Sequence, residues 1–142
     1  ELLEPLEGRL DRGRLHAVGW LPLERLLALF QVSAAHVYLS YPYTLSWSVL
    51  QAMACGAPVV GNADGPLAEL IEPERNGLLI EGCRPSALAA AVLRLLQDAS
   101  WRQALGVEGR RTVLERFRVD WAAEAYLRQI REHGTPNCAA ID

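Results

Sequence analysis

One stretch of this sequence, residues 38–61, limits the fold more than any other. It reads as a strand, a tight loop, a short helix and a second strand, with Gly56 placed to end the helix. The loop over residues 41–45 leads directly into a helix that starts at Ser46 or Trp47. A strand that reaches the next strand through a helix is typical of a parallel α/β sheet.

The remaining segments continue this alternation along the chain. Short apolar runs predict four strands, over residues 15–20, 34–39, 57–60 and 77–81. Apolar residues spaced three and four positions apart predict a helix after Pro22, and three C-terminal helices over residues 85–97, 101–117 and 121–133. We expect Asp120 to cap the last helix, and residues 62–66 to form a turn before a helical turn over residues 67–71.

Charge and residue usage exclude several classes of function. The chain has 142 residues, a net charge of −3 and no basic stripe, so we do not expect it to bind nucleic acid. All 14 basic residues are arginine, which excludes a lysine nucleophile or a P-loop lysine in this segment. Three widely spaced cysteines argue against a disulfide framework or zinc site and fit a reducing cytosol. No apolar run approaches the length of a membrane span, so we expect a cytoplasmic protein.

The start of the helix after residues 41–45 is the strongest candidate for a binding site. This loop and the one over residues 61–66 both follow the carboxyl ends of strands, where parallel α/β sheets bind ligands. The first turn of a helix exposes unpaired N–H groups and a partial positive charge, which suits a phosphate or diphosphate. The alternative is that Thr44 or Ser46 only caps the helix, and the sequence leaves both explanations open.

Side chains near these two loops also have two explanations each. Gln51 either reaches the hydroxyl groups of a ligand or closes a capping box with Ser48. Tyr43 and Trp47 either stack on a ligand or belong to the core. Glu69 either binds a sugar hydroxyl or accepts a proton there, or it is a solvated helix carboxylate.

No pattern of residues indicates a cofactor or a metal ion. His16 and His36 fall in predicted strands, and we expect both to be core histidines rather than ligands or catalysts. The sequence has no glycine-rich dinucleotide fingerprint, no P-loop, no ordered catalytic triad and no cluster of metal ligands. We therefore expect neither a cofactor nor a metal.

The order of motifs resembles the carboxyl-terminal half of a GT-B glycosyltransferase of the retaining group 1 family, also called family 4. The similarity runs from about residue 15 to residue 126, and its most specific parts are QAMACGAPVVG, GPLAEL and NGLLI. It implies a Rossmann-like α/β domain, a parallel sheet flanked by helices, over residues 1–134, with a tail over residues 135–142. In this family the domain binds a nucleotide-sugar donor.

The resemblance also implies a partner that this sequence lacks. Group 1 enzymes carry an acceptor-binding domain before the donor half, so we expect a fold truncated at its N-terminus and inactive as an isolated fragment. Any contact with a membrane would be made through that missing half. Because the helix start and arginines can carry the charge of the diphosphate, no metal is implied.

The resemblance assigns donor-binding roles within the sequence. The N–H groups of residues 45–47 would cradle the diphosphate, and Gln51 would hold the ribose. Trp20 and Leu21, at the end of the first predicted strand, would lie beside the nucleotide base. Glu69 matches the glutamate that the family carries at its second loop. The full candidate set is Trp20, Leu21, Tyr43, Thr44, Leu45, Ser46, Trp47, Gln51 and Glu69.

The sequence departs from the family at this same loop. The family carries two glutamates with seven residues between them, and Tyr43 and Gln51 stand at those two positions. Residues 44–46 replace a glycine-rich turn, which gives the backbone less freedom near a phosphate. Two interpretations follow. The chain is either the donor-binding domain of a glycosyltransferase or a non-catalytic sugar-nucleotide-binding or interaction domain that has lost its acids.

Overall fold

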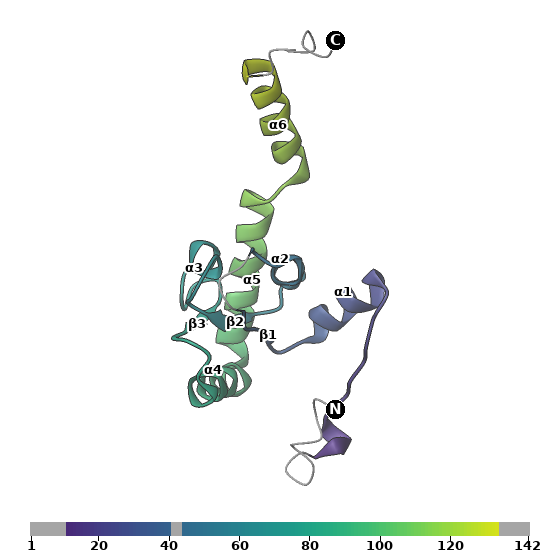
Figure 1. Ribbon diagram of the computed structural model, residues 1–142. Coiled ribbons are helices and arrows are strands. Elements are labelled where there is room, and N and C mark those ends of the chain that lie inside the picture. The colour runs from purple at the N-terminus through teal and green to yellow at the C-terminus, as the bar shows by residue number, and fades with distance from the viewer. Residues whose placement is uncertain (1–10, 41–43, 134–142) are drawn as a thin grey trace, which may run out of the picture.

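Three parallel strands form the sheet in the computed structural model, which describes residues 11–40 and 44–133 (Figure 1). They are β1 (His36–Tyr38), β2 (Val59–Asn62) and β3 (Leu78–Ile80), in the order β1-β2-β3. His36 of β1 is in register with Val59, and Val60 is in register with Leu78 of β3. The parallel α/β architecture predicted from the alternating segments is confirmed.

Helices connect and cover these strands. α1 (Leu23–Val32) precedes β1, α2 (Trp47–Ala54) joins β1 to β2, and α3 (Leu67–Leu70) joins β2 to β3. After the sheet come α4 (Pro85–Gln97), α5 (Ala99–Arg116) and α6 (Val119–His133), and a 3-10 turn, η2 (Arg12–Arg14), lies near the N-terminus. The bounds of α4 are those predicted, because its apolar stripe begins at a proline suited to the first helical turn.

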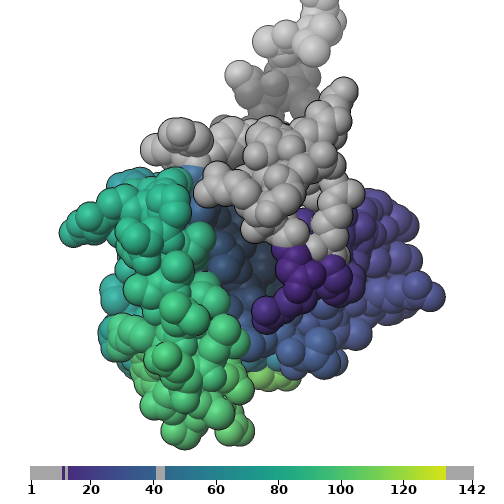
Figure 2. Space-filling view, turned by 90° about the horizontal axis from the view of Figure 1, so that it is seen from below, coloured from purple at the N-terminus to yellow at the C-terminus, as the bar shows by residue number. Residues whose placement is uncertain are grey.

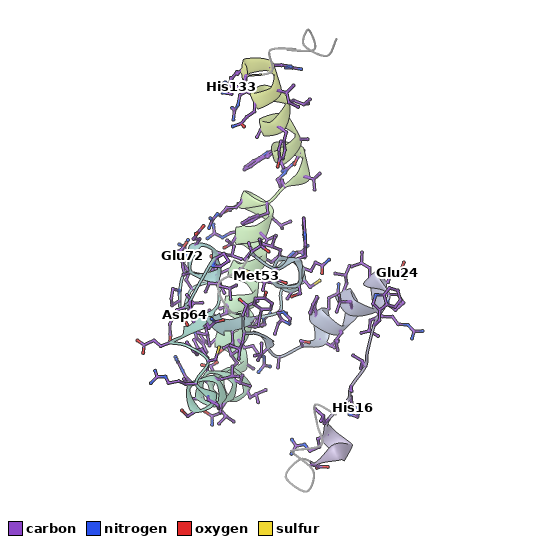
Figure 3. The ribbon with its side chains drawn as sticks, viewed as in Figure 1. His16, Glu24, Met53, Asp64, Glu72 and His133 are labelled. Atoms are coloured by element: carbon purple, nitrogen blue, oxygen red, sulfur yellow. The ribbon has the colours of Figure 1, made fainter. Side chains whose placement is uncertain are left out.

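Strand β2 is buried on both faces, which explains its continuous apolar sequence. Val59 packs in a cluster with residues of α1, α2, α3 and α5, such as Phe30 and Met53. Val60 packs in a second cluster with residues of α4 and α5, such as Leu95. Because these clusters lie on its two faces, β2 is at the centre of the hydrophobic core. Burial of each valine side chain contributes about 1.5–3 kcal/mol to stability. Figure 3 shows Met53 beside α5.

Two glycines set the spacing between α2 and α5. Gly56 follows α2 with φ of 82°, a conformation that favours glycine. A Cβ atom added at Gly106 of α5 would lie 2.2 Å from the carbonyl oxygen of Gly56. The two backbones are therefore in direct contact, and no larger residue fits at position 106 without moving a helix.

The predicted strand over residues 15–20 is wrong, because the structure shows extended coil there. A strand needs hydrogen-bond partners, and within the described residues the sheet consists of β1, β2 and β3 alone, none of which pairs with residues 15–20. In Figure 2 the purple N-terminal residues accordingly lie across a blue hollow from the green helices. Within the described residues β1 has an open edge, where Val37 is 42 % exposed.

Three other element predictions need correction. β2 continues to Asn62, within the predicted turn, because the backbone of Asn62 pairs with Ile80 of β3. α5 begins at Ala99, two residues earlier than predicted, with the carboxylate of Asp98 accepting from Trp101 N–H at 2.9 Å. α6 begins at Val119, so Asp120 lies inside the first turn and pairs with Arg118 instead of capping the helix. The predicted tail, residues 135–142, lies outside the described residues.

Helix α6 extends away from the rest of the molecule (Figure 1). None of its residues is buried, although its apolar side includes Trp121, Tyr126, Leu127 and Ile130. Among residues 11–40 and 44–133, no helix combines the length and apolar character needed to cross a bilayer.

Candidate functional site

Helix α2 starts at the carboxyl edge of the sheet, as the sequence predicted. Ser46 is its N-cap, and its Oγ accepts a hydrogen bond from the N–H of Ser48 at 3.2 Å. The capping explanation for Ser46 is therefore correct, but it uses only part of the helix start. Within the described residues, the N–H groups of Leu45, Ser46 and Trp47 have no hydrogen-bond partner. These N–H groups, together with the positive end of the helix dipole, remain free to bind an anion.

Of the two explanations for Gln51, the structure excludes the capping box with Ser48. The box requires its serine at the N-cap, whereas Ser48 is the second residue of the helix. Gln51 makes no side-chain hydrogen bond among the described residues, and its side chain lines a groove of about 740 Å³. The amide of Gln51 is thus free to bond with a ligand.

The groove lies between α2, the end of α5 and the beginning of α6. Its twelve lining residues are mostly apolar: Trp47, Leu50, Gln51, Ala54, Val113, Arg116, Phe117, Arg118, Val119, Trp121, Ala122 and Ala125. Trp47 is 78 % exposed at the first position of α2, so the core explanation for this residue is wrong. Its ring is available to stack on a planar group.

The second loop leads to α3, where Glu69 has an exposed side chain. The guanidinium of Arg116 donates to the backbone carbonyl of Glu69 at 3.3 and 3.4 Å. Arg116 also lines the groove with Gln51, so it links the groove to α3, the helix that follows the second loop. No local sequence pattern indicates a role for this arginine, because it lies 47 positions from its partner.

The structure does not bring every predicted site residue together. Trp20, which is 87 % exposed, and Leu21 lie in the coil before α1, and neither lines the groove with Gln51. The strand expected to place them is not formed. Thr44 is exposed next to the helix start, and Tyr43 lies outside the described residues.

The two histidines differ in their surroundings. His36 in β1 packs edge-on against Phe30, with ring centroids 5.0 Å apart, and its buried Nε2 has no hydrogen-bond partner among the described residues. Burial lowers the pKa of His36, because the charged imidazolium is poorly solvated there. His36 is the predicted core histidine. The same prediction is wrong for His16, which is exposed and lies apart from the sheet (Figure 3).

The lowered pKa of His36 predicts a pH-dependent stability. The unfolded chain titrates His36 near pH 6.5, so stability is complete above this pH and falls as the pH drops toward the folded pKa. The slope from one proton is at most about 1.4 kcal/mol per pH unit. Urea unfolding at pH 5 to 8 should show a smaller loss for His36→Leu than for the unmodified chain. His16→Leu is the control and should keep the full loss; equal slopes in all three proteins contradict the prediction.

Comparison with known proteins gives one consistent result. Residues 1–98 match the family described as glycosyl transferases group 1. The chain is 32 % identical to the D-inositol 3-phosphate glycosyltransferase of Frankia alni, over 84 % of this chain and 29 % of that protein.

Solved structures give the same fold. The structure superposes on sucrose-phosphate synthase of Thermosynechococcus elongatus with a TM-score of 0.84 and 31 % identity, over 92 % of this chain and 32 % of that one. It superposes on Anabaena HepE in complex with UDP and glucose with a TM-score of 0.76 and 21 % identity, over 81 % and 31 % of the two chains.

The chain spans 20–30 % of the length of the first curated relatives that it matches. Its sheet and flanking helices superpose on a corresponding part of much longer proteins. The family match covers more than half of the sequence, in agreement with the motifs of residues 51–61 and 65–70. The chain therefore belongs to the group 1 glycosyltransferases and has the fold of the C-terminal half of a GT-B enzyme.

Proposed function

We propose that this chain is the donor-binding part of a glycosyltransferase that transfers a sugar from a nucleoside-diphosphate sugar to an acceptor. The observation that carries the proposal is the start of α2, where three backbone N–H groups without partners among the described residues meet the positive end of a helix. The complexes of HepE with UDP and with UDP-glucose support a nucleotide of this kind, because HepE shares the fold.

The groove next to this helix start suits the rest of the donor. Gln51 lies one turn into α2 and offers both an amide donor and an acceptor to ribose hydroxyl groups. The exposed ring of Trp47 adds a flat apolar surface. During transfer, negative charge grows on the leaving diphosphate, and N–H groups already oriented toward it stabilise that charge without a metal ion.

An upstream acceptor domain is the partner that we propose for this chain. Helix α6 supports this idea, because its apolar side is exposed while the helix extends away from the sheet. In this arrangement the donor binds in the cytoplasm, between the two halves of the longer protein.

A second candidate function is sugar-nucleotide binding without catalysis. It is favoured by Gln51, an uncharged side chain at a position where the family carries an acid. The two candidates differ in one measurement, which is sugar transfer from UDP-, GDP- or ADP-linked donors by the longer protein. Release of the nucleoside diphosphate together with a glycosylated product favours the enzyme; binding without release favours the second candidate.

Binding is tested directly by titration calorimetry of the 142-residue chain with UDP, GDP and ADP. We expect one of the three to bind, and no binding of any of them would contradict the proposed function.

Gln51→Ala should weaken that binding by about fivefold. The expected loss corresponds to a net hydrogen-bond contribution of about 1 kcal/mol, because the amide no longer meets the ribose. Gln97→Ala is a suitable control, since Gln97 is exposed at the end of α4 and takes no part in the groove. If Gln51→Ala and Gln97→Ala bind the nucleoside diphosphate with equal affinity in calorimetry, Gln51 does not contact the ligand.

A further inference from the structure

Helix α5 packs alongside α2 and runs in the opposite direction (Figure 1). The guanidinium of Arg110 in α5 donates to the carbonyl oxygen of Ala54, the last residue of α2. Further along α5, Arg116 lines the groove together with Trp47, the first residue of α2. Because each residue of an α-helix advances about 1.5 Å, the step from Arg110 to Arg116 and the step from Ala54 back to Trp47 each cover about 10 Å. Arg116 is therefore about level with the start of α2.

The charge of Arg116 is not neutralised by any carboxylate among the described residues. Its guanidinium donates twice to one acceptor, the backbone carbonyl of Glu69, at 3.3 and 3.4 Å. These distances exceed the usual range for N–H···O bonds, and a guanidinium has five donors in all. The other arginine of the groove, Arg118, is paired with Asp120. Arg116 therefore gives the groove a positive charge with donors left for a ligand.

The remaining lining of the groove is compatible with a bound anion. None of its twelve lining residues is an aspartate or a glutamate. Most of the lining is apolar, and the amide of Gln51 offers a further hydrogen-bonding group beside the cation. A groove of about 740 Å³ has the size of sites that take small organic ligands. Its lining thus suits a ligand that carries both a negative group and a flat apolar part.

The direction of α5 also favours a cation at this position. Because α5 ends at Arg116, the negative end of its dipole lies toward the positive end of α2. An anion at the start of α2 would be repelled by the carbonyl groups that end α5. Arg116 stands in the last turn of α5, where a positive charge offsets that repulsion.

We propose that Arg116 binds the diphosphate of the nucleotide-sugar donor, an inference that rests on the function proposed above. With the donor bound, the guanidinium exchanges its long contacts with the carbonyl of Glu69 for charge-assisted hydrogen bonds to phosphate oxygens. Its planar arrangement of donors matches two oxygens of a phosphate at once. When the bond between the sugar and the diphosphate breaks, the electron pair stays on the diphosphate oxygen. The same guanidinium stabilises this added negative charge.

Arg102 provides a matched control on the same helix. It also donates to a backbone carbonyl, that of Leu95, at 2.8 Å, and it does not line the groove. Glutamine at position 102 or 116 removes the charge but keeps an amide that can donate to a carbonyl. A difference between the two variants therefore reports the charge in the groove rather than the packing of α5.

The experiment measures Kd by titration calorimetry for UDP, GDP or ADP, whichever the unmodified chain binds most tightly, at a temperature where melting curves show all proteins folded. We expect Arg116→Gln to raise Kd about tenfold and Arg116→Lys, which keeps the charge, to raise it only about threefold. Arg102→Gln should change Kd less than about twofold. If Arg116→Gln binds as tightly as the unmodified chain, or if Arg102→Gln weakens binding equally, the inference is overturned and the proposed function stands. If the unmodified chain binds no nucleoside diphosphate, both fail.

The dependence of Kd on salt gives a second readout, which a role in holding α3 alone would not change. Salt screens the attraction between the guanidinium and the diphosphate. The Kd of the unmodified chain should therefore rise more steeply with NaCl concentration than the Kd of Arg116→Gln. Equal slopes for the two proteins would mean that Arg116 only holds the end of α3, and they would overturn the inference.

Discussion

Replacing Trp47 by proline should weaken nucleoside-diphosphate binding by about 10- to 100-fold and leave the fold intact. Proline has no N–H group, and Trp47 is the first residue of α2, where proline is well tolerated. The preceding Ser46 already has φ of −77° and ψ of 136°, which a following proline requires. The substitution therefore removes one N–H group from the proposed diphosphate site. A hydrogen bond to a charged group contributes about 1.5–3 kcal/mol.

Trp47→Ala separates the lost N–H group from the lost ring. This control removes the indole but keeps the backbone donor, so its affinity in calorimetry should lie between those of the unmodified chain and Trp47→Pro. Circular dichroism should show the same helix content in all three proteins. If Trp47→Pro binds as tightly as Trp47→Ala, the start of α2 is not the diphosphate site.

Gly106→Ala should lower the free energy of unfolding by about 3 kcal/mol or more. The new methyl group would lie 2.2 Å from the carbonyl oxygen of Gly56, and backbone cannot give way as a flexible side chain can. Overpacking of this kind costs about 1–3 kcal/mol even where side chains absorb it. In urea unfolding, the variant should have a lower midpoint and the same dependence on urea concentration.

The second glycine of α5 gives the matched comparison. A Cβ atom at Gly109 would lie 3.1 Å from the carbonyl oxygen of Asn76, a tight contact that a small shift relieves. Alanine also gains about 1 kcal/mol of helix propensity over glycine. Gly109→Ala should therefore lose much less stability than Gly106→Ala. A more stable Gly106→Ala protein would mean that helix propensity outweighs the contact between α2 and α5.

Local patterns in the sequence were sufficient to predict most helices and the parallel sheet. The bounds of α4 follow from its apolar stripe and its initial Pro85, both of which act within a few residues. The carboxyl edge of the sheet followed from the order of strands and helices, and the start of α2 lies there. Residues 15–20 show where this reasoning fails, because an apolar run becomes a strand only when another strand lies beside it.

The details of the site depend on contacts between distant residues, which no local pattern shows. Asn62 looked like a turn residue, although its amide bonds with Ser40 across the sheet. Arg116 lies within the predicted helix over residues 101–117 without any further pattern, although it reaches the carbonyl of Glu69 and lines the groove with Gln51. The Ser48–Gln51 spacing fits a capping box, but the N-cap is Ser46, so the helix starts two residues too early for Ser48 to form the box.

The open edge of β1 also affects how this chain behaves at high concentration. Among residues 11–40 and 44–133 no strand pairs with this edge, which makes it a template for a strand of another molecule, and the exposed Val37 adds an apolar contact there. The apolar side of α6 is a second adhesive surface on the same molecule. We therefore expect these two surfaces to promote self-association of the chain at high concentration.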